Sequence, residues 1–511
     1  MQFSITLTLI LIVLALTGCG VPSPRGFRSY DDGAVIVRIL PRRLTDNQYF
    51  HVSPKIIAER ESSNQKEAQT YQITPLKKGY YNTPIYSASL PEGTYRILES
   101  QDIDCNYYCS ELDNHIPAGK FEIRKSQLTD LGTIILATTG KSDTALLVHN
   151  STVDPNTSEQ IREMAPGLSS TLQKPILTWL PDTVPGSMPE QFMHAIQSGS
   201  NLASPKELSN GDFLYGDSHG QIIQWHQKNS QFTYQSIASV PIEAINVSQD
   251  GSWLAGGLGT LLKRDPKDGS WQSIRGNLPY GLTLDIFEWR GQNIVALLDR
   301  QDLKIYTAKQ GEINWSLIAT RDAIKAYTMM GENTWRRPLT RLVDNHLIIA
   351  GSGRIMANLD LETQKVEEYP PQEVVSELAA TGDNILRCFC TGKILESRDY
   401  GKTWTNVNSS SRNFRFYKPP VFKDKEHGVA LAITDPSNIN PRLIYTSDSG
   451  KTWSISTTPL SMERKSAPPK EWYLSYSKIN SNIYLSDQRG VIMASTDNGK
   501  SWGRSYQSTL Q

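Results

Sequence analysis

An eight-residue segment recurs three times near the end of the chain at a constant spacing. Each copy reads Ser/Thr-x-Asp-x-Gly-Lys-Ser/Thr-Trp, and the copies begin at Ser397, Thr446 and Ser495, two intervals of 49 residues. Repeats of about 40–50 residues built from short strands are typical of β-propellers, in which each repeat forms one four-stranded blade. The spacing therefore predicts a propeller in the C-terminal part of the chain.

Weaker copies of this segment precede the three regular ones. They keep only part of the pattern, at Trp225–Tyr234, Asp265–Trp271, Gly311–Trp315 and Asp360–Val366. Residues 206–511 then divide into seven units of about 44 residues each, which predicts seven blades. The first unit lacks an obvious innermost strand, and Pro175–Trp179 is a segment that could supply it.

The repeated segment resembles the Asp-box, or BNR repeat, of sialidase-like propellers and of assembly factors for photosystem II. In a tight hairpin the aspartate can accept backbone N–H bonds, the glycine supplies a positive φ, and the tryptophan packs beneath the turn. The resemblance likewise implies a structural role away from any active site. We therefore assign turn roles and no catalysis to Asp399, Gly401, Trp404, Asp448, Gly450, Trp453, Asp497, Gly499 and Trp502.

The first residues predict export and a lipid anchor. Residues Ile5–Leu16 are apolar apart from two threonines, a run shorter than the roughly 20 residues of a membrane span and typical of a signal peptide. The run ends in Leu16-Thr17-Gly18-Cys19, which resembles a bacterial lipobox. The resemblance implies a signal peptide over 1–18, lipidation (including palmitate) at Cys19, and sorting to the outer membrane of the cell envelope. A plain secretory signal is the alternative.

Two regions separate the signal peptide from the propeller. Short strands with turn signals between them, such as Ala34–Leu40 and Leu131–Leu136, predict a β-sandwich over 19–150. Residues 151–205 are predicted to form a helical linker, with one helix opened by Asp154-Pro155 and a second over Pro189–Ile196. The predicted fold class is all-β: an N-terminal β-sandwich, a short helical linker, and a seven-bladed β-propeller over 206–511.

Four cysteines remain if Cys19 carries the lipid. A disulfide between Cys105 and Cys109 is plausible in an exported protein, whereas a bond between Cys388 and Cys390 would close a strained ring. No histidine pair or C-x-x-C spacing accompanies these cysteines, so neither a metal site nor a cofactor is predicted.

Charge and loop composition favour a binding protein. The 52 basic residues balance the 52 acidic ones, which argues against nucleic acid as the main partner. Three long connections between blades, over 321–340, 408–420 and 457–472, combine basic and aromatic residues, which are common interface anchors. We expect this face to bind an acidic protein or an acidic glycan; a solvated rim without a ligand is the alternative. The predicted binding residues are Trp335, Arg336, Arg337, Arg412, Arg415, Tyr417, Arg464 and Trp472.

Catalysis is the competing interpretation. Residues Gly216–Gly220 match the G-x-S-x-G pattern, but a strand follows them, so a hairpin turn is expected instead of a nucleophile elbow. The resemblance to sialidases implies an exo-sialidase-like glycoside hydrolase as the alternative function, although the arginine motif of the first blade is missing. Glycosidases need two carboxylates about 5–10 Å apart. A cluster of arginine, tyrosine and glutamate at the propeller axis would favour the enzyme, and scattered rim charges would favour the binder.

Overall fold

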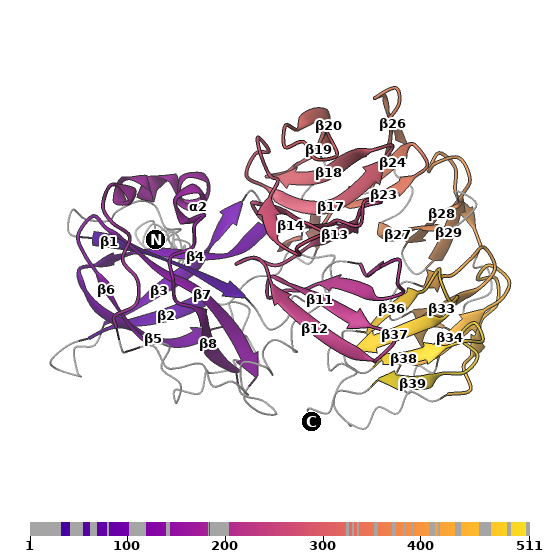
Figure 1. Ribbon diagram of the computed structural model, residues 1–511, viewed down its shortest axis with the longest axis horizontal. Helices are drawn as coiled ribbons and strands as arrows, with labels where there is room; N and C mark the ends of the chain where they lie inside the picture. Colours follow the sequence, from indigo (N-terminus) through magenta and orange to yellow (C-terminus); the bar gives the residue numbers. More distant parts are fainter. Residues whose placement is uncertain are drawn as a thin grey trace, which may run out of the picture.

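The chain folds into an N-terminal sheet and a C-terminal propeller that lie side by side (Figure 1). The structure is a computed structural model. It describes residues 32–40, 55–61, 69–78, 81–101, 119–138, 144–181, 183, 204–322, 327–329, 332–334, 337–351, 356–369, 375–381, 385–390, 393–407, 414–416, 420–434, 441–458, 472–487 and 492–506.

Eight N-terminal strands form one mixed sheet in the order β6-β5-β2-β3-β4-β1-β7-β8. Strands β1 and β7 run parallel, and the other neighbours run antiparallel. The strands are β1 (Asp32–Leu40), β2 (Lys55–Arg60), β3 (Gln69–Lys78), β4 (Tyr81–Pro91), β5 (Gly93–Gln101), β6 (Lys120–Ile123), β7 (Leu128–Thr138) and β8 (Thr144–Asn150).

This sheet is a single curled half-barrel, so the predicted β-sandwich is wrong. Register shifts interrupt four of its strand pairs and increase the local twist. The concave face closes over its own apolar core, which Trp179 caps: its ring lies edge-on to Phe121, and its Nε1 donates to the Leu131 carbonyl at 2.9 Å. Short strands separated by turns have the same sequence pattern in both architectures, so the pattern does not distinguish them.

All of strand β1 is buried, because both faces of the sheet are covered there. Val35 and Val37 point into the concave core. Ala34 and Ile36 point the other way, as the two-residue period of a strand requires, and join a second core that includes propeller residues. The N-terminal sheet and the propeller therefore share apolar packing.

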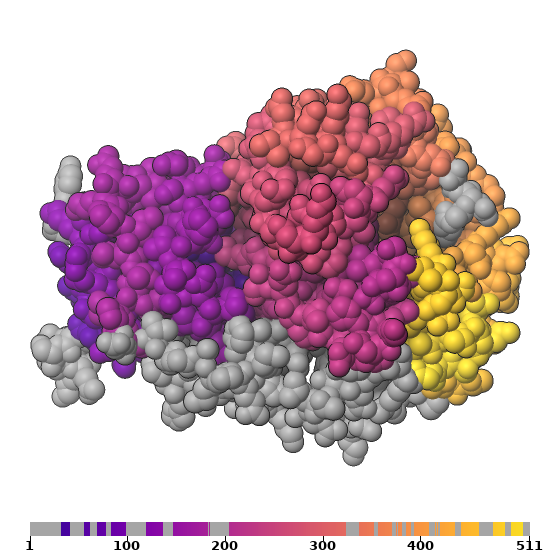
Figure 2. Space-filling view, in the orientation of Figure 1, coloured from indigo at the N-terminus to yellow at the C-terminus, as the bar shows by residue number. Residues whose placement is uncertain are grey.

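Two short helices lie in this second core. They are α2 (Thr157–Met164) and the 3-10 helix η2 (Pro166–Gln173). Ile161 and Leu168 are buried in the same cluster as Leu258 and Tyr280 of the propeller. Figure 2 shows the N-terminal part of the chain in contact with the propeller. Among the described residues, no helix combines the length and the apolar character that crossing a membrane requires. The helix predicted over Pro189–Ile196 lies outside the described residues.

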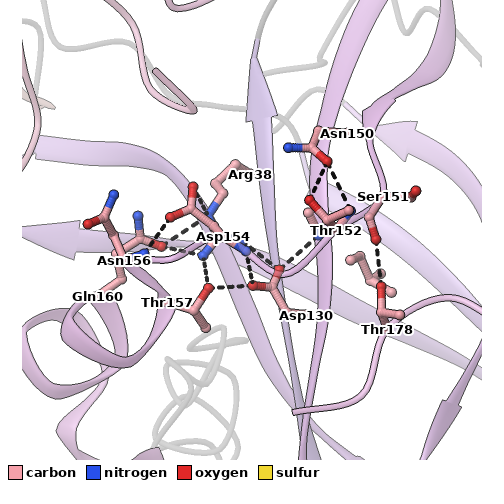
Figure 3. Close-up of polar contacts among 12 residues, drawn as sticks. Arg38, Asp130, Asn150, Ser151, Thr152, Asp154, Asn156, Thr157, Gln160 and Thr178 are labelled. Atoms are coloured by element: carbon pink, nitrogen blue, oxygen red, sulfur yellow. Dashed lines mark hydrogen bonds and ion pairs between the residues drawn. The ribbon is translucent and has the colours of Figure 1, made fainter. Parts of the chain in front are cut away.

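A buried polar network fixes α2 against the sheet (Figure 3). The fully buried Arg38 of β1 donates through Nη1 to Asp130 at 2.5 Å and through Nη2 to the Thr157 hydroxyl at 2.6 Å. Its Nε donates to Gln160 at 3.0 Å and lies 3.7 Å from the Asp154 carboxylate. Because each of these bonds has a set direction, the network fixes the orientation of the helix as well as its burial.

The predicted seven-bladed propeller is confirmed: consecutive strands form seven sheets of four or five strands. Blade 1 is β9 (Lys206–Glu207), β10 (Phe213–Gly216), β11 (Gln221–His226) and β12 (Gln231–Ser236); blade 2 is β13 (Ala244–Val247), β14 (Trp253–Gly257), β15 (Thr260–Arg264) and β16 (Trp271–Ser273); blade 3 is β17 (Leu282–Trp289), β18 (Gln292–Asp299), β19 (Asp302–Lys309) and β20 (Ser316–Asp322). A hairpin of β21 (Tyr327–Met329) and β22 (Glu332–Thr334) follows.

The remaining four blades complete the ring. Blade 4 is β23 (Leu339–Val343), β24 (His346–Ala350), β25 (Met356–Asp360) and β26 (Val366–Tyr369); blade 5 is β27 (Val375–Thr381), β28 (Ile385–Cys390), β29 (Lys393–Ser397) and β30 (Thr405–Asn406); blade 6 is β31 (Arg415–Phe416), β32 (Val421–Phe422), β33 (Gly428–Ile433), β34 (Arg442–Thr446) and β35 (Ser454–Ile455); blade 7 is β36 (Trp472–Tyr476), β37 (Ile483–Asp487), β38 (Ile492–Ser495) and β39 (Gly503–Tyr506).

The antiparallel order within each blade gives the propeller two faces. The turns joining the first strand to the second and the third to the fourth lie on one side, here called the turn face. The turns joining the second strand to the third, and the links to the next blade, lie on the other side, here called the connection face. The links that lead to β23, β31 and β36, which include the three long connections singled out in the sequence, therefore begin and end on the connection face.

The ring closes without exchanging a strand between its ends. Strand β9 supplies the innermost strand of blade 1, so the expectation that Pro175–Trp179 fills this place is wrong. Leu177 and Trp179 instead form bridges to Thr129 and Phe121 of the N-terminal sheet. Closure consequently depends on side chains from blades 1 and 7.

Tyr484 of blade 7 is the apolar centre of this seam. Its ring packs edge-on against Phe213 and Trp225 of blade 1, with centroids 5.6 and 5.0 Å apart. Gln227 donates to the tyrosine hydroxyl at 2.8 Å. The seam thus combines aromatic packing with a hydrogen bond that satisfies the hydroxyl.

Glu207 of blade 1 accepts hydrogen bonds from blade 7 across the seam, and its replacement should weaken ring closure. Its carboxylate accepts from the Ser477 hydroxyl, the Lys478 N–H at 2.7 Å and the Ile479 N–H at 3.5 Å. We expect Glu207→Gln to lower the free energy of unfolding by about 1–3 kcal/mol, because an amide loses the charge-assisted bonds. Urea denaturation measures this, with the exposed Glu312→Gln as control. Equal stability of both variants would show that the hydrogen bonds of Glu207 do not stabilise the closed ring.

Candidate functional site

The three regular repeats form the same turn in blades 5, 6 and 7, between the third and fourth strands. In the first copy Asp399 accepts the Thr403 N–H at 2.9 Å and the Thr403 hydroxyl at 2.6 Å, and Trp404 Nε1 donates to the Gly401 carbonyl at 3.0 Å. The other two copies repeat these bonds. The four weaker copies fall at the corresponding turn of blades 1 to 4.

These turns have a structural role, because each aspartate carboxylate accepts hydrogen bonds from its own turn. Desolvation would raise the pKa of Asp399, but bonds from the Thr403 hydroxyl and backbone lower it below its usual value, so the group stays ionised. Gly499 has φ +89°, and a Cβ there would lie 2.3 Å from Val429 of the neighbouring blade. Position 499 therefore admits only glycine without a shift of the blades.

Of the predicted binding residues, Arg337 is the one whose side chain is described, and it is not free. It forms an ion pair with Glu243 and donates to the Leu284 carbonyl at 3.0 Å. It thereby ties blade 4 to blades 2 and 3, and a charge reversal there would break this contact. The side chains of Trp335, Arg336, Arg412, Arg415, Tyr417, Arg464 and Trp472 lie outside the described part of the structure.

The innermost strands of four blades each carry a polar residue that the sequence analysis missed. Lys206 of β9, Asp285 of β17, Arg341 of β23 and Tyr476 of β36 all belong to innermost strands; we call them the axial cluster. Desolvation raises the pKa of Asp285, and the charges of Lys206 and Arg341 partly offset this. Desolvation also raises the pKa of Tyr476, and the charge of Arg341 partly offsets this.

Hydrogen bonds hold the acid and the guanidinium in place. Asp285 accepts the Thr340 hydroxyl from the next blade at 3.2 Å and the Ile286 N–H at 3.0 Å. Arg341 donates through Nε and Nη2 to the Leu378 carbonyl of blade 5, at 3.3 and 3.0 Å. The innermost strands of blades 3, 4 and 5 are thus tied together around the axis.

Lys206 differs from these two residues because nothing pairs with it. Within the described structure its ammonium has neither a hydrogen bond nor an ion pair within 4 Å. Desolvation lowers its pKa, yet Lys206, Asp285 and Arg341 all keep partial exposure, so solvent reaches them. Desolvation without a nearby hydrogen-bond acceptor disfavours the charged form of this ammonium.

The remaining catalytic interpretations receive little support from geometry. Residues Gly216–Gly220 form the hairpin turn expected between β10 and β11, and Ser218 is fully buried, so it is no exposed nucleophile. Arg341 and Tyr476 do both belong to innermost strands, as an axial sialidase-like site would require. The carboxylate of the adjacent Glu207, however, already accepts hydrogen bonds from the turn after β36.

The cysteines and potential metal ligands can be placed only in part. Cys388 is disulfide-bonded in the core of blade 5, and its partner sulfur lies outside the described side chains. Cys105 and Cys109 also lie outside the described residues. Over the described part of the chain, no group of three or more His, Cys, Asp and Glu residues is arranged to hold a metal ion.

Comparisons with known proteins give weak likenesses. No family profile and no curated protein matches the chain. Among solved structures, a Ycf48 protein bound to a D1 peptide matches with a TM-score of 0.45 and 13% identity, covering 58% of this chain and 91% of that one. Ycf48 from Cyanidioschyzon merolae gives 0.42 and 12%, covering 56% and 92%, and BamB from Moraxella catarrhalis gives 0.37 and 13%, covering 61% and 84%. Scores this low carry no argument about function.

Proposed function

We propose that this protein is a binding scaffold of the bacterial cell envelope, anchored through lipid on Cys19, whose propeller holds an anionic protein or glycan on its connection face. The observation that carries the proposal is the fixed attachment of the propeller to the N-terminal sheet. Long loops on a rigid framework are a common arrangement for binding. The lipid anchor rests on the lipobox-like sequence.

The attachment has support on both sides of α2. On the sheet side, Arg38 holds the helix through Thr157 and Gln160. On the propeller side, Glu159 forms an ion pair with Arg275. With the shared apolar core between them, these contacts keep the propeller at one angle to the sheet, and hence to the membrane if the anchor is present.

The anionic nature of the partner is supported by the long connections. Arg336, Arg412 and Arg464 fall in links between blades that begin and end on the connection face, and Arg415 is the first residue of β31, the first strand of blade 6. Several arginines on one face attract acidic partners and steer their approach. Arg337 is excluded from this set because it pairs with Glu243.

The proposal is tested by capture of a partner from detergent-solubilised envelopes with the tagged lipoprotein, identifying both proteins and glycans. We expect a stoichiometric partner that is released at high salt. We also expect Arg336→Glu with Arg415→Glu to lose it. The matched control is Lys228→Glu with Lys267→Glu, two exposed lysines on the turn face. A partner retained by the first pair, or lost equally by both pairs, would contradict the proposal.

A sialidase-like glycoside hydrolase is the second candidate, favoured by the place of Arg341 and Tyr476 on innermost strands, where the charge of Arg341 lowers the pKa of Tyr476 against the effect of desolvation. The purified protein can be tested directly with a fluorogenic sialoside. Turnover would establish the enzyme, whereas a stoichiometric partner without turnover would support the scaffold.

A further inference from the structure

We infer that Cys388 of β28 is bonded to Cys390, two residues further along the same strand, and that this disulfide is a redox-labile site that a small thiol such as glutathione reduces. The starting observation is that Cys388 is disulfide-bonded. The inference concerns a bond within blade 5 and does not depend on the proposed binding function, so a failure of partner capture leaves it standing.

The positions of the other cysteines identify the partner. Cys105 and Cys109 fall between β5 and β6 of the N-terminal sheet, and Figure 1 shows these strands at the opposite end of the molecule from β28. Cys19 precedes β1 of the same sheet and is the predicted site of the lipid. Cys390 is the last residue of β28 itself, so it is the cysteine within reach of Cys388.

The backbone of β28 places the two cysteines on the same face of the strand. Side chains alternate along a strand, so positions 386, 388 and 390 share one face and position 389 lies on the other. The cores follow this alternation: Leu386 and Cys388 are buried together with Met356 of blade 4, whereas Phe389 packs against a different cluster. Position 390 therefore belongs to the face of blade 5 that packs against blade 4.

An extended strand holds such a pair at the limit of what a disulfide can bridge. Two residues of an antiparallel strand separate their Cα atoms by about 6.8 Å, the upper end of the usual range for a disulfide. Strand β28 pairs with β29 in continuous register through Cys390. On its other side, β27 has a register shift between Val375 and Glu377, the partners of Cys390 and Phe389, and such a bulge increases the local twist. Reduction would release the strand from this constraint, and strained disulfides are the readily reduced ones.

Reduction exchanges the bond with two thiol molecules. Because Cys388 is buried, the first thiolate attacks the sulfur of Cys390. The bond between the cysteines breaks, Cys388 leaves as a thiolate that takes up a proton, and the donor stays joined to Cys390. A second donor thiolate then attacks the donor sulfur of this mixed disulfide, and Cys390 leaves and takes up a proton. The two donors lose two electrons and form a disulfide, and the strand gains two thiols.

Peptide mapping of the full chain tests the pairing, because Arg387 and Lys393 flank both cysteines. Free thiols are alkylated in denaturant, and the protein is then digested with trypsin without reduction. We expect residues 388–393 as one peptide that carries no alkyl group and is lighter by two hydrogen atoms than its dithiol form. Alkylation of this peptide, or its linkage to a peptide that contains Cys105 or Cys109, would overturn the inference.

Equilibration with graded glutathione buffers tests the lability. The full chain carries Cys105→Ser and Cys109→Ser, so that a single pair titrates, and the peptide 388–393 reports its state. We expect the dithiol to be favoured about tenfold more in the folded protein than in urea, because the unfolded chain can bend to relieve the ring and β28 cannot. An equal or smaller fraction of dithiol in the folded protein would overturn the lability.

Stability gives a second readout whose sign is opposite to that of an ordinary disulfide. A ring with one residue between its cysteines removes less chain entropy from the unfolded state than a long loop does. We therefore expect the reduced protein to resist urea better than the oxidised protein. The matched control adds Cys390→Ser, which has no such ring, so its stability should not change with glutathione. A reduced protein that is less stable than the oxidised one would contradict the inference.

Discussion

Replacing Arg38 by methionine is expected to lower the free energy of unfolding by about 3–5 kcal/mol, the usual cost of removing one partner from a buried ion pair. Methionine keeps most of the length of arginine but carries no charge, so Asp130 is left fully buried without its cation. Asp130 still accepts the Gly132 N–H at 2.8 Å and the Asp154 N–H at 3.1 Å. Urea denaturation followed by far-UV circular dichroism measures the loss.

A double variant tests whether charge is the cause. Arg38→Met with Asp130→Asn removes both charges, so it should recover part of the stability that Arg38→Met loses. Loss of the network should also release α2, which limited proteolysis detects as faster cleavage within residues 151–181. A single variant within about 0.5 kcal/mol of the wild type, the scatter of an ordinary surface substitution, would show that the network does not fix the helix.

The propeller was predictable because its repeat is encoded locally. The aspartate, glycine and tryptophan of each regular turn bond within eight residues of one another, as Asp399 and Thr403 do. A local geometry of this kind leaves a local sequence pattern, and the constant interval then sets the blade size. The hairpin at Gly216–Gly220 was predictable for the same reason.

Features that depend on distant parts of the chain were missed. The half-barrel depends on which strands pair, and strand β1 pairs with β4 and β7, which follow it by dozens of residues. The axial cluster consists of positions 206, 285, 341 and 476, which belong to four innermost strands that are far apart in the sequence. The one available signal was Asp285, a charge between the apolar residues Leu284 and Ile286 of β17. Arg337 was expected to be a free ligand because its partner Glu243 is far away in sequence.

Replacing Asp217 by asparagine is expected to change how stability depends on pH. Asp217 is fully buried in the turn between β10 and β11, where Oδ1 accepts the N–H groups of His219 and Gln221 at 3.0 and 2.8 Å. Its Oδ2 has no hydrogen-bond partner among the described residues, and His219 Nδ1 lies 3.9 Å away. Desolvation raises the pKa of Asp217 from 3.8 to about 8.

Because the folded-state pKa lies above the unfolded-state value, folding takes up a proton at pH values between the two. The stability of the wild type should therefore fall as the pH rises from about 4 to about 8, and remain at the lower level above that range. Asparagine can still accept both N–H bonds and cannot ionise. Asp217→Asn should match the wild type near pH 4 and exceed its stability above pH 8, by on the order of 6 kcal/mol.

Urea denaturation at a series of pH values measures this difference directly, with Asp322→Asn as the control. Asp322 is an exposed aspartate at the end of β20, so its replacement should leave the pH profile parallel to that of the wild type. If the Asp217→Asn and wild-type profiles also run parallel across pH 4 to 8, Asp217 is ionised throughout and must have a counter-ion. If they diverge as expected, this turn of blade 1 carries a buried proton at neutral pH and loses it in mild alkali.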